Sequence, residues 1–355
     1  MPSTPHPHPT PDALRGLPDA LRGLIVRTPA KLNLFLELHG KRPDGYHELE
    51  TVMIPVSRFD TLHVRATAEH DEVRLRSRWL PSPAQWSRAL GDAAGPLLSI
   101  ADDSTNLIHL GASAAKRLFR FPWGIEITAG KRIPAGAGMG GASSDAAAAI
   151  LAVATLAGIN RADPRLAEIA ASIGSDVPFF LGDHPPISRF SAALATGRGE
   201  RLRPIAIPDR LWFVVAFPRG GLSTAKVYAA CQIPDQPVPV KNFLAALTAG
   251  SAGALHSMLL NRLSQPARNL SPLVGDLLSL MEQSGLTPAM LTGSGSACFA
   301  LCESREDARQ KGETLRKAWS RRPDRGIVMV LSSVSRRPAL RQISRRSVPP
   351  SADRR

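Results

Sequence analysis

Cysteines and clustered metal ligands are scarce in this 355-residue sequence. Its three cysteines, Cys231, Cys298 and Cys302, form no CxxC pair, and its nine histidines are scattered without the spacing of metal ligands. A disulfide framework needs paired cysteines, and a structural zinc site needs closely spaced cysteines or histidines. We therefore expect reduced thiols and no bound zinc.

Long apolar runs are also missing. The longest nearly uninterrupted one, residues 146–159, is shorter than the roughly 20 residues that a membrane-spanning helix needs. The chain does not open with a charged segment followed by an apolar one, as a secretory signal would. These absences favour a cytoplasmic protein without a membrane segment, and they predict a core helix at residues 146–159.

Acidic residues are outnumbered by basic ones, and the formal net charge is +14. Residues 335–355 carry seven arginines and one aspartate, which is +6 of that excess. This segment has no apolar periodicity and no aromatic-rich basic module beside it, so it predicts a disordered tail rather than an obligatory nucleic-acid-binding domain. Residues 1–24 contain PDALRGL twice after a Pro- and His-rich start, and they predict a second disordered appendage.

Between these tails, strand-like and helix-like patterns are mixed and predict an α+β protein with two domains. Residues 25–190 would form the first domain and residues 191–334 the second, with a surface insertion at residues 79–100. Alternating or buried apolar residues predict strands at 24–40, 48–67, 124–130 and 210–218. Helical patterns cover 106–119, 146–158, 165–173, 240–247, 273–285 and 305–319.

A glycine-rich stretch, RIPAGAGMGGASSDAAAAI at residues 132–150, runs directly into an alanine-rich helix. Glycine lets the backbone approach a ligand closely, and the start of a helix offers free N–H groups and the positive end of its dipole. The junction therefore predicts a phosphate-binding site. It is not a P-loop, because Ala142 follows Gly141 where that motif requires lysine.

The dinucleotide-binding pattern G-x-G-x-x-G does match Gly136, Gly138 and Gly141. That site needs a buried strand that leads into the glycines and an acidic residue at the end of the next strand. Here residues 130–134 interrupt the approach, and Asp163, at the expected distance, is more typical of a helix cap. This interpretation and a purely structural glycine turn are minor alternatives.

Four separated stretches together resemble the GHMP kinases, small-molecule kinases whose glycine loop differs from the P-loop. They are TPAKLNLFLELHGKRPDGYHELETV (28–52), the glycine loop (134–147), GSDVPFFLG (174–182) and LTGSGSACFAL (291–301). The resemblance implies a two-domain GHMP kinase fold, with an N-terminal ribosomal-protein-S5-like α/β domain that binds ATP and a C-terminal α/β sandwich domain. The PDGYHEL segment further resembles the members whose substrate carries a cytidine diphosphate.

The resemblance implies ATP-dependent phosphorylation of a hydroxyl group on a small-molecule substrate, with ATP and Mg²⁺ as cofactors. It places Lys31 and Asp176 beside that hydroxyl as the catalytic pair. An ammonium group keeps a neighbouring carboxylate ionised and ready to accept a proton. Asn33, on the same strand face as Lys31, would join them at the substrate. Taken alone, Lys31 is typical of a solvated strand residue and Asp176 of a helix cap.

The nucleotide-binding residues that the resemblance implies lie in two stretches. Asn106 would contact the adenine, or would merely cap the helix that follows it. The loop would hold the phosphates through Pro134, Gly136, Gly138, Gly140, Gly141, Ser143 and Ser144. Either Ser143 or Ser144 would reach the phosphates or the Mg²⁺, and no other metal site is expected.

Binding of the substrate is implied for two further groups of residues. Tyr46 and Tyr228 would stack on the cytosine, and His47 would form a hydrogen bond with it. A glycine turn would line the substrate site near the phosphates, or would only link two elements, and it consists of Gly293, Ser294 and Gly295.

Three alternatives stay open from the sequence. A homoserine or mevalonate kinase would share the glycine loop and the glycine turn but would lack PDGYHEL. A non-catalytic, basic RNA-binding protein on this fold would carry its positive charge on folded elements, whereas here much of it lies in the tail. An inactive kinase would not need intact Lys31 and Asp176. Both a monomer and a homodimer are compatible with the sequence.

Overall fold

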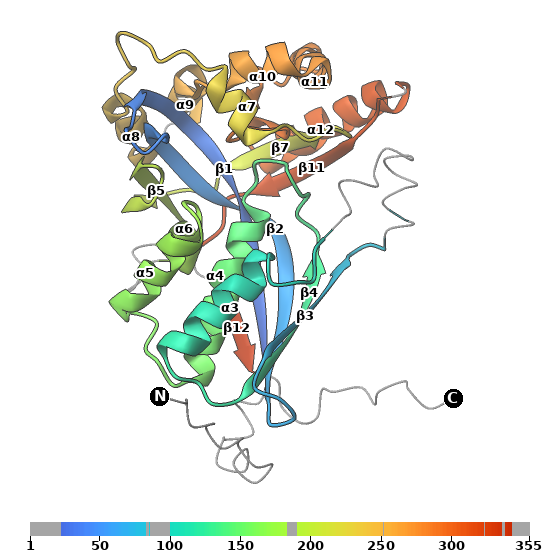
Figure 1. Ribbon diagram of the computed structural model, residues 1–355. Coiled ribbons are helices and arrows are strands. Elements are labelled where there is room, and N and C mark those ends of the chain that lie inside the picture. The colour runs from blue at the N-terminus through green and yellow to red at the C-terminus, as the bar shows by residue number, and fades with distance from the viewer. Residues whose placement is uncertain are drawn as a thin grey trace.

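The computed structural model describes residues 23–82, 85, 100–182, 190–250, 252–322, 324–335 and 338–342. Two β-sheets with helices packed on them make up this part of the chain (Figure 1). Most of the tandem PDALRGL segment and most of the expected insertion at residues 79–100 lie outside the described residues. Gly23 and Leu24, expected to belong to the N-terminal appendage, are instead buried at the start of the first strand. Within the described ranges, no helix is long and apolar enough to cross a membrane.

The first sheet is built around one long antiparallel hairpin, β1 (Gly23–Lys41) and β2 (His47–Thr67). Its other strands are β3 (Val73–Trp79), β4 (Gly124–Lys131), β5 (Phe190–Gly197), β6 (Arg201–Ile207), β8 (Leu260–Asn261) and β12 (Ala339–Gln342). The order is β12-β1-β2-β4-β3, while β5 and β6 extend from β2 and β8 pairs with β1. The hairpin and the β4 strand confirm the strands expected at 24–40, 48–67 and 124–130.

One face of this sheet is covered by α3 (Leu107–Leu118), α4 (Gly141–Leu156), α5 (Pro164–Ile173) and α6 (Val177–Leu181) (Figure 1). The alanines of α4 from Ala146 to Ala154 are fully buried, because small side chains let this helix pack closely against α3, β1 and β2. Asp163 caps α5 by accepting a hydrogen bond from the Arg165 N–H, which confirms the expected helix cap.

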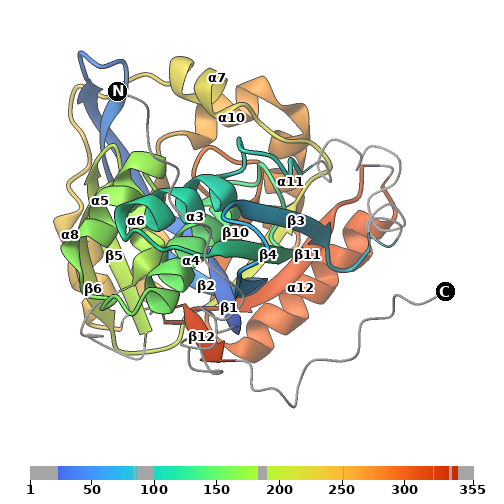
Figure 2. The same cartoon turned by 60° about the horizontal axis from the view of Figure 1, so that its bottom comes forward.

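The second sheet has the order β11 (Ile327–Ser332), β7 (Trp212–Phe217), β10 (Cys298–Cys302) and β9 (Met290–Leu291). The helices of this half are α7 (Thr224–Ala229), α8 (Lys241–Thr248), α9 (Ala252–Met258), α10 (Ser264–Leu270), α11 (Pro272–Gln283) and α12 (Arg305–Ser320). Figure 2 shows α12 packed along β11. The expected helices at 240–247, 273–285 and 305–319 are therefore confirmed.

A shared apolar core joins the two sheets. Successive β7 residues point to opposite faces, so Phe213, Val215 and Phe217 belong to one core while Val214 and Ala216 belong to another. The first of these cores also contains residues of β1, β2, β5, α8 and the glycine loop, and the second packs against α10, α11 and α12. The two halves of the chain are thus held together by buried apolar surface rather than by a linker.

Two expected boundaries differ from the structure. The strands do not divide between residues 190 and 191, because β5 and β6 continue the first sheet and β8 returns to it after β7. The segment 335–355, expected to be disordered, contributes β12, which pairs antiparallel with Leu24–Arg27 of β1. Arginines surround this short strand in the sequence, and it reaches the core of the first sheet through Leu340. Its apolar signal was therefore too short to predict a strand.

We expect β12 to contribute to stability. A chain of residues 23–335 should melt a few degrees lower than a chain of residues 23–342. The shorter chain loses the β12–β1 hydrogen bonds and the Leu340 contact. Each 1 kcal/mol lost from the free energy of unfolding lowers the melting temperature of a protein of this size by about 2–4 °C or less. Thermal unfolding followed by circular dichroism measures the difference, and equal melting temperatures would contradict the prediction.

Candidate active site

Two cavities meet at the glycine loop. The larger, of about 770 Å³, is lined by β1, the β1–β2 hairpin, the β5–β6 turn, the start of α6, α7 and the turn between β9 and β10. The smaller, of about 400 Å³, is lined by the loop itself, the start of α3 and the end of β4. Gly138, Gly140 and Ser143 line both, so a molecule in one cavity would face a molecule in the other across the loop.

The loop has the backbone that a phosphate cradle requires. Gly136, Gly138 and Gly140 have positive φ angles of 64°, 71° and 71°, which other residues rarely adopt. Gly140 is also the N-cap of α4, where it brings no side chain to compete for the first N–H groups of the helix. Gly141 differs, because it is already the first residue of α4 and a Cβ there would lie 2.9 Å from Ile133 Cγ2.

Backbone hydrogen bonds fix the loop from two sides. The Lys31 N–H of β1 donates to the Met139 carbonyl at 3.0 Å. From the second sheet, the Ala297 N–H donates to the Ala137 carbonyl at 3.1 Å. The loop is therefore ordered by β1 and by the β9–β10 turn together, before any ligand contributes.

Lys31 and Asp176 lie together at the junction of the cavities. Lys31 Nζ is 3.6 Å from Asp176 Oδ2, and both residues line the larger cavity. The Lys31 side chain is buried, whereas 35% of the Asp176 side chain is exposed. Asp176 is the N-cap of α6 but makes no capping hydrogen bond with its side chain, so the carboxylate is not occupied by the helix. The structure thus brings together the two residues that the sequence paired.

Asn33 holds the ammonium group of Lys31 in place. Its Oδ1 accepts a hydrogen bond from Lys31 Nζ at 2.5 Å, and its Nδ2 donates to Thr51 Oγ1 at 2.8 Å. The Asn33 N–H donates to Thr292 Oγ1 at 3.1 Å and so connects β1 to the β9–β10 turn. Two register shifts of the β1–β2 ladder flank this segment, and such irregularities re-aim side chains near active sites.

Tyr46, His47 and Tyr228 line the larger cavity. The His47 and Tyr228 rings lie 5.3 Å apart, tilted by 37°. Tyr46 is 52% exposed, and the guanidinium carbon of Arg198 lies 4.8 Å from the centre of its ring. Burial, together with the positive charge of Lys41, lowers the pKa of His47. Its imidazole is therefore neutral at pH 7 and offers one donor and one acceptor.

The two loop serines have different surroundings. Ser144 is buried, and its hydroxyl contacts Thr28 Oγ1 and donates to the Pro29 carbonyl at 2.6 Å, so it joins α4 to β1. Ser143 is only half-buried and lines both cavities. Of the two alternatives that the sequence left open, this placement favours Ser143 as the one that reaches a ligand.

Asn106 and Pro134 lie in the smaller cavity. Asn106 also caps α3, because its Oδ1 accepts from the Ile108 N–H at 2.9 Å and its Nδ2 donates to the Ala101 carbonyl at 2.6 Å. Both expectations for this residue are thus compatible, since a residue that caps the helix also borders the cavity.

The glycine turn contributes two of its three expected residues to the larger cavity, Gly293 and Ser294. Gly293 has a positive φ of 56°, and a Cβ there would lie 3.3 Å from Lys31 Nζ. Ser294 Oγ is 2.8 Å from Thr224 Oγ1, which joins the turn to α7. Gly295 instead packs its backbone against the Leu291 side chain.

Sequence reasoning missed a buried charge cluster beneath the loop. Lys131 donates to both Asp60 and Asp145, and all three side chains are buried. Asp60 also accepts a hydrogen bond from the Ile133 N–H at 2.8 Å, where the loop begins. Burial raises the pKa of Asp145 to about 7 with help from the negative charge of Asp60, and the opposing effect of Lys131 does not cancel the rise. Asp60 could have been noticed in the sequence, because it is a charged residue within the apolar alternation of β2.

Two family profiles match the chain: GHMP kinases N terminal domain over residues 106–183 and GHMP kinases C terminal over residues 243–321. The first profile spans the glycine loop and Asp176, and the second spans the turn between β9 and β10. Together with the fold, these matches define a small-molecule kinase of the GHMP class.

A 4-diphosphocytidyl-2-C-methyl-D-erythritol kinase of Rhodopirellula baltica is 42% identical over 299 residues, which cover 82% of this chain and 90% of that protein. A kinase of the same name from Bacillus subtilis is 34% identical over 283 residues, covering 79% and 88%. The chain belongs to the family of these 4-diphosphocytidyl-2-C-methyl-D-erythritol kinases.

Solved structures agree with this membership. A crystal structure of 4-(cytidine 5'-diphospho)-2C-methyl-D-erythritol kinase has a TM-score of 0.66 and 32% identity, covering 88% of this chain and 99% of that one. A homoserine kinase from Cytophaga hutchinsonii has the same TM-score of 0.66 at 19% identity, covering 90% and 97%. The second similarity shows the fold alone.

We expect Gly138 to be far more sensitive to substitution than Gly136. Both have positive φ angles, so alanine costs about 1–2 kcal/mol of backbone strain at either position. A Cβ at Gly138 would also lie 2.2 Å from the Thr292 carbonyl oxygen, whereas a Cβ at Gly136 would meet no atom within 4 Å. Gly138→Ala should therefore lower the free energy of unfolding by about 3 kcal/mol or more. Urea denaturation of both variants measures this, and equal losses would refute the close contact.

Proposed function

We propose that this chain transfers the γ-phosphoryl group of ATP to the 2-hydroxyl of 4-diphosphocytidyl-2-C-methyl-D-erythritol, a step of the non-mevalonate isoprenoid pathway. The observation that carries the proposal is the Lys31–Asp176 pair, 3.6 Å apart, in a cavity that adjoins the glycine loop. The larger cavity, of about 770 Å³, is large enough for a nucleotide-linked alcohol, and the smaller one adjoins it on the side where ATP would bind.

Asp176 acts as the general base in this proposal. As the substrate oxygen bonds to the γ-phosphorus, the bond from that phosphorus to the β–γ bridging oxygen breaks and ADP leaves. The proton of the substrate hydroxyl moves to the Asp176 carboxylate. Lys31, 3.6 Å from this carboxylate, stabilises the negative charge that develops on the attacking oxygen. Because Asn33 holds the Lys31 ammonium, the charge is in position before the substrate binds.

ATP binds with its phosphates on the N–H groups of the glycine loop and its base beside Asn106 and Pro134. The described residues contain no group of three or more histidine, cysteine or acidic side chains that would hold a metal ion. With few protein ligands at hand, the site fits Mg²⁺ that would be bound mainly by phosphate oxygens and water, and the Ser143 hydroxyl would be the protein ligand. When bound, Mg²⁺ neutralises charge on the β- and γ-phosphates.

The base of the substrate binds at the other end of the larger cavity. Tyr46 and Tyr228 provide aromatic surface for the cytosine, and the neutral His47 provides a donor and an acceptor for its polar edge. Cytosine presents an amino donor beside a ring-nitrogen acceptor, and uracil reverses both. A site that pairs with one base therefore leaves buried polar groups unpaired with the other.

Asp176→Asn should lower kcat by roughly a hundredfold or more, which is the usual contribution of a general base. The asparagine keeps the shape of the side chain, so the Kd for ATP and the melting temperature should stay nearly unchanged. Asp163→Asn is the matched control and should keep the full rate, because Asp163 caps α5 and asparagine caps a helix equally well. A coupled assay of ADP release measures kcat, and a normal rate for Asp176→Asn would refute the assignment.

The uridine analogue of the substrate should be used less well than the cytidine compound, by roughly a hundredfold in kcat/KM. His47→Ala should bring the kcat/KM values of the two compounds closer together, because it removes a group that distinguishes the two bases. Tyr46→Ala should weaken both compounds with little change in their ratio, since stacking tolerates either pyrimidine. Steady-state kinetics with both compounds test this, and equal use by the unmodified protein would contradict the proposed substrate.

A further inference from the structure

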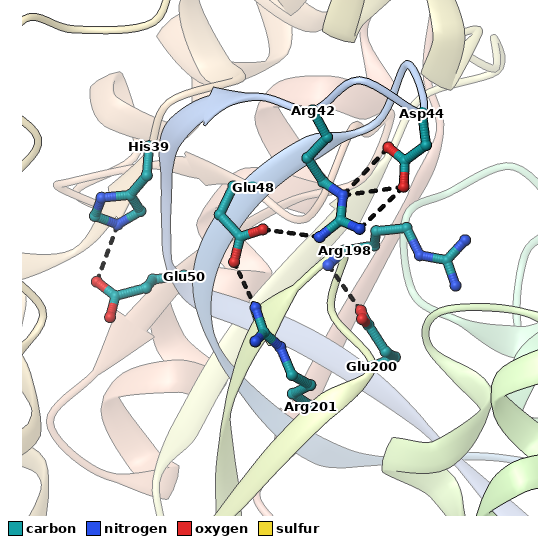
Figure 3. Close-up of polar contacts among 8 residues, drawn as sticks. All are labelled: His39, Arg42, Asp44, Glu48, Glu50, Arg198, Glu200 and Arg201. Atoms are coloured by element: carbon teal, nitrogen blue, oxygen red, sulfur yellow. Dashed lines mark hydrogen bonds and ion pairs between the residues drawn. The ribbon is translucent and has the colours of Figure 1, made fainter.

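Three arginines gather where the β1–β2 hairpin meets the β5–β6 turn (Figure 3). Arg42 pairs with Asp44 and Glu48, each at 3.0 Å. Arg201 pairs with the same Glu48 at 2.6 Å. The positive charges of these two arginines are therefore balanced by neighbouring carboxylates, and the pairs tie the hairpin to the turn.

Arg198 is the third arginine, and its guanidinium is not paired in this way. Among the residues that the structure describes, no carboxylate lies within ion-pair distance of it, and Figure 3 shows the side chain extending away from Glu200. The guanidinium carbon instead lies 4.8 Å from the centre of the Tyr46 ring. Arg198 also lines the larger cavity. Hydrogen bonds from Arg42 lower the pKa of Asp44 and the positive charge of Arg198 helps to lower it, but that carboxylate is already paired with Arg42, so Arg198 keeps positive charge for the space where the substrate would bind.

The backbone of the turn sets where the Arg198 side chain begins. Gly197 and Gly199, on either side of it, have positive φ angles of 76° and 112°. The Arg198 N–H donates to Glu200 Oε2 at 2.7 Å. This backbone conformation sets the direction in which the Arg198 side chain leaves the turn, and the Tyr46 ring then contacts its guanidinium.

The turn also lies close to the reacting pair. A Cβ at Gly199 would be 3.9 Å from Asp176 Oδ1, so the residue after Arg198 adjoins the general base of the proposed mechanism. Arg198 itself contacts Tyr46. The turn therefore connects the aromatic end of the cavity with its reacting end.

The charge balance of the larger cavity leaves positive charge for a ligand. Its basic lining residues are Lys31, Lys41 and Arg198, and its acidic one is Asp176. Lys31 is already paired with Asp176. Lys41 is exposed at the end of β1, whereas Arg198 is half-buried. Arg198 is thus the better ordered of the two unpaired cations.

We propose that Arg198 binds the diphosphate group of the substrate. The inference rests on the proposed function, in which this diphosphate connects the cytidine to the methylerythritol unit. A substrate with its base at Tyr46 and its hydroxyl at Asp176 has its diphosphate between them, beside Arg198. A guanidinium presents a planar fork of N–H donors that forms paired, charge-assisted hydrogen bonds with phosphate oxygens.

Binding of cytidine 5'-diphosphate and of cytidine, measured by isothermal titration calorimetry, tests this assignment. Arg198→Gln should weaken the binding of cytidine 5'-diphosphate by about tenfold, which corresponds to one charge-assisted interaction. The affinity for cytidine should stay nearly unchanged, because cytidine has no phosphate. The affinity of Arg198→Lys for cytidine 5'-diphosphate should lie between those of the unmodified protein and Arg198→Gln, since lysine keeps the charge but lacks the fork of N–H donors. In turnover, Arg198→Gln should raise KM with little change in kcat.

Arg203→Gln is the matched control. Arg203 is an exposed arginine on β6 outside the larger cavity, and its loss should change neither affinity. If Arg198→Gln weakened cytidine and cytidine 5'-diphosphate equally, Arg198 would act by supporting Tyr46, and the proposal would be overturned. An unchanged affinity for both compounds would also overturn it. If the unmodified protein bound neither compound, the failure would lie with the proposed function and not with Arg198.

Discussion

The backbone of Gly138 lies so close to the β9–β10 turn that a Cβ would be 2.2 Å from the Thr292 carbonyl oxygen. This approach joins a loop of the first sheet to a turn of the second, and the same turn accepts a hydrogen bond from the Asn33 N–H through Thr292 Oγ1. Lys31 donates to the loop from β1. The close contact and these two hydrogen bonds together set the positions of the proposed phosphate cradle and of the basic residue beside it, so a shift between the sheets would disturb both.

The charge under the loop complements this packing. Asp60 accepts hydrogen bonds from backbone N–H groups at the start of the loop and shares Lys131 with Asp145. Such a cluster fixes the loop, but it also places one more carboxylate than ammonium beneath a site for anions. Burial raises the pKa of Asp145 to about 7, so this carboxyl is partly protonated near neutral pH and the excess negative charge is smaller. In the proposed function, the N–H groups of the loop would then face the ATP phosphates with less opposing charge behind them.

The sequence was most informative where a local pattern determines a local structure. The glycines before an alanine-rich helix predicted the cradle, and the spacing of Lys31 and Asn33 placed both on one strand face. The Lys31–Asp176 pair could be predicted only through the family resemblance, since 145 residues of chain separate its members. Arg198 and the Asp60–Lys131–Asp145 cluster escaped notice, because their roles depend on contacts between distant segments that no local periodicity encodes.

The pairing of β12 with β1 has a consequence for how the chain is made. Leu24 leaves the ribosome early and Gln342 late, yet the two lie opposite each other in the first sheet. While the chain is being synthesised, the outer edge of β1 along Leu24–Arg27 exposes backbone N–H and C=O groups that other chains could pair with. The last described segment to be translated closes that edge, so the first sheet reaches its full width only after the second sheet has emerged.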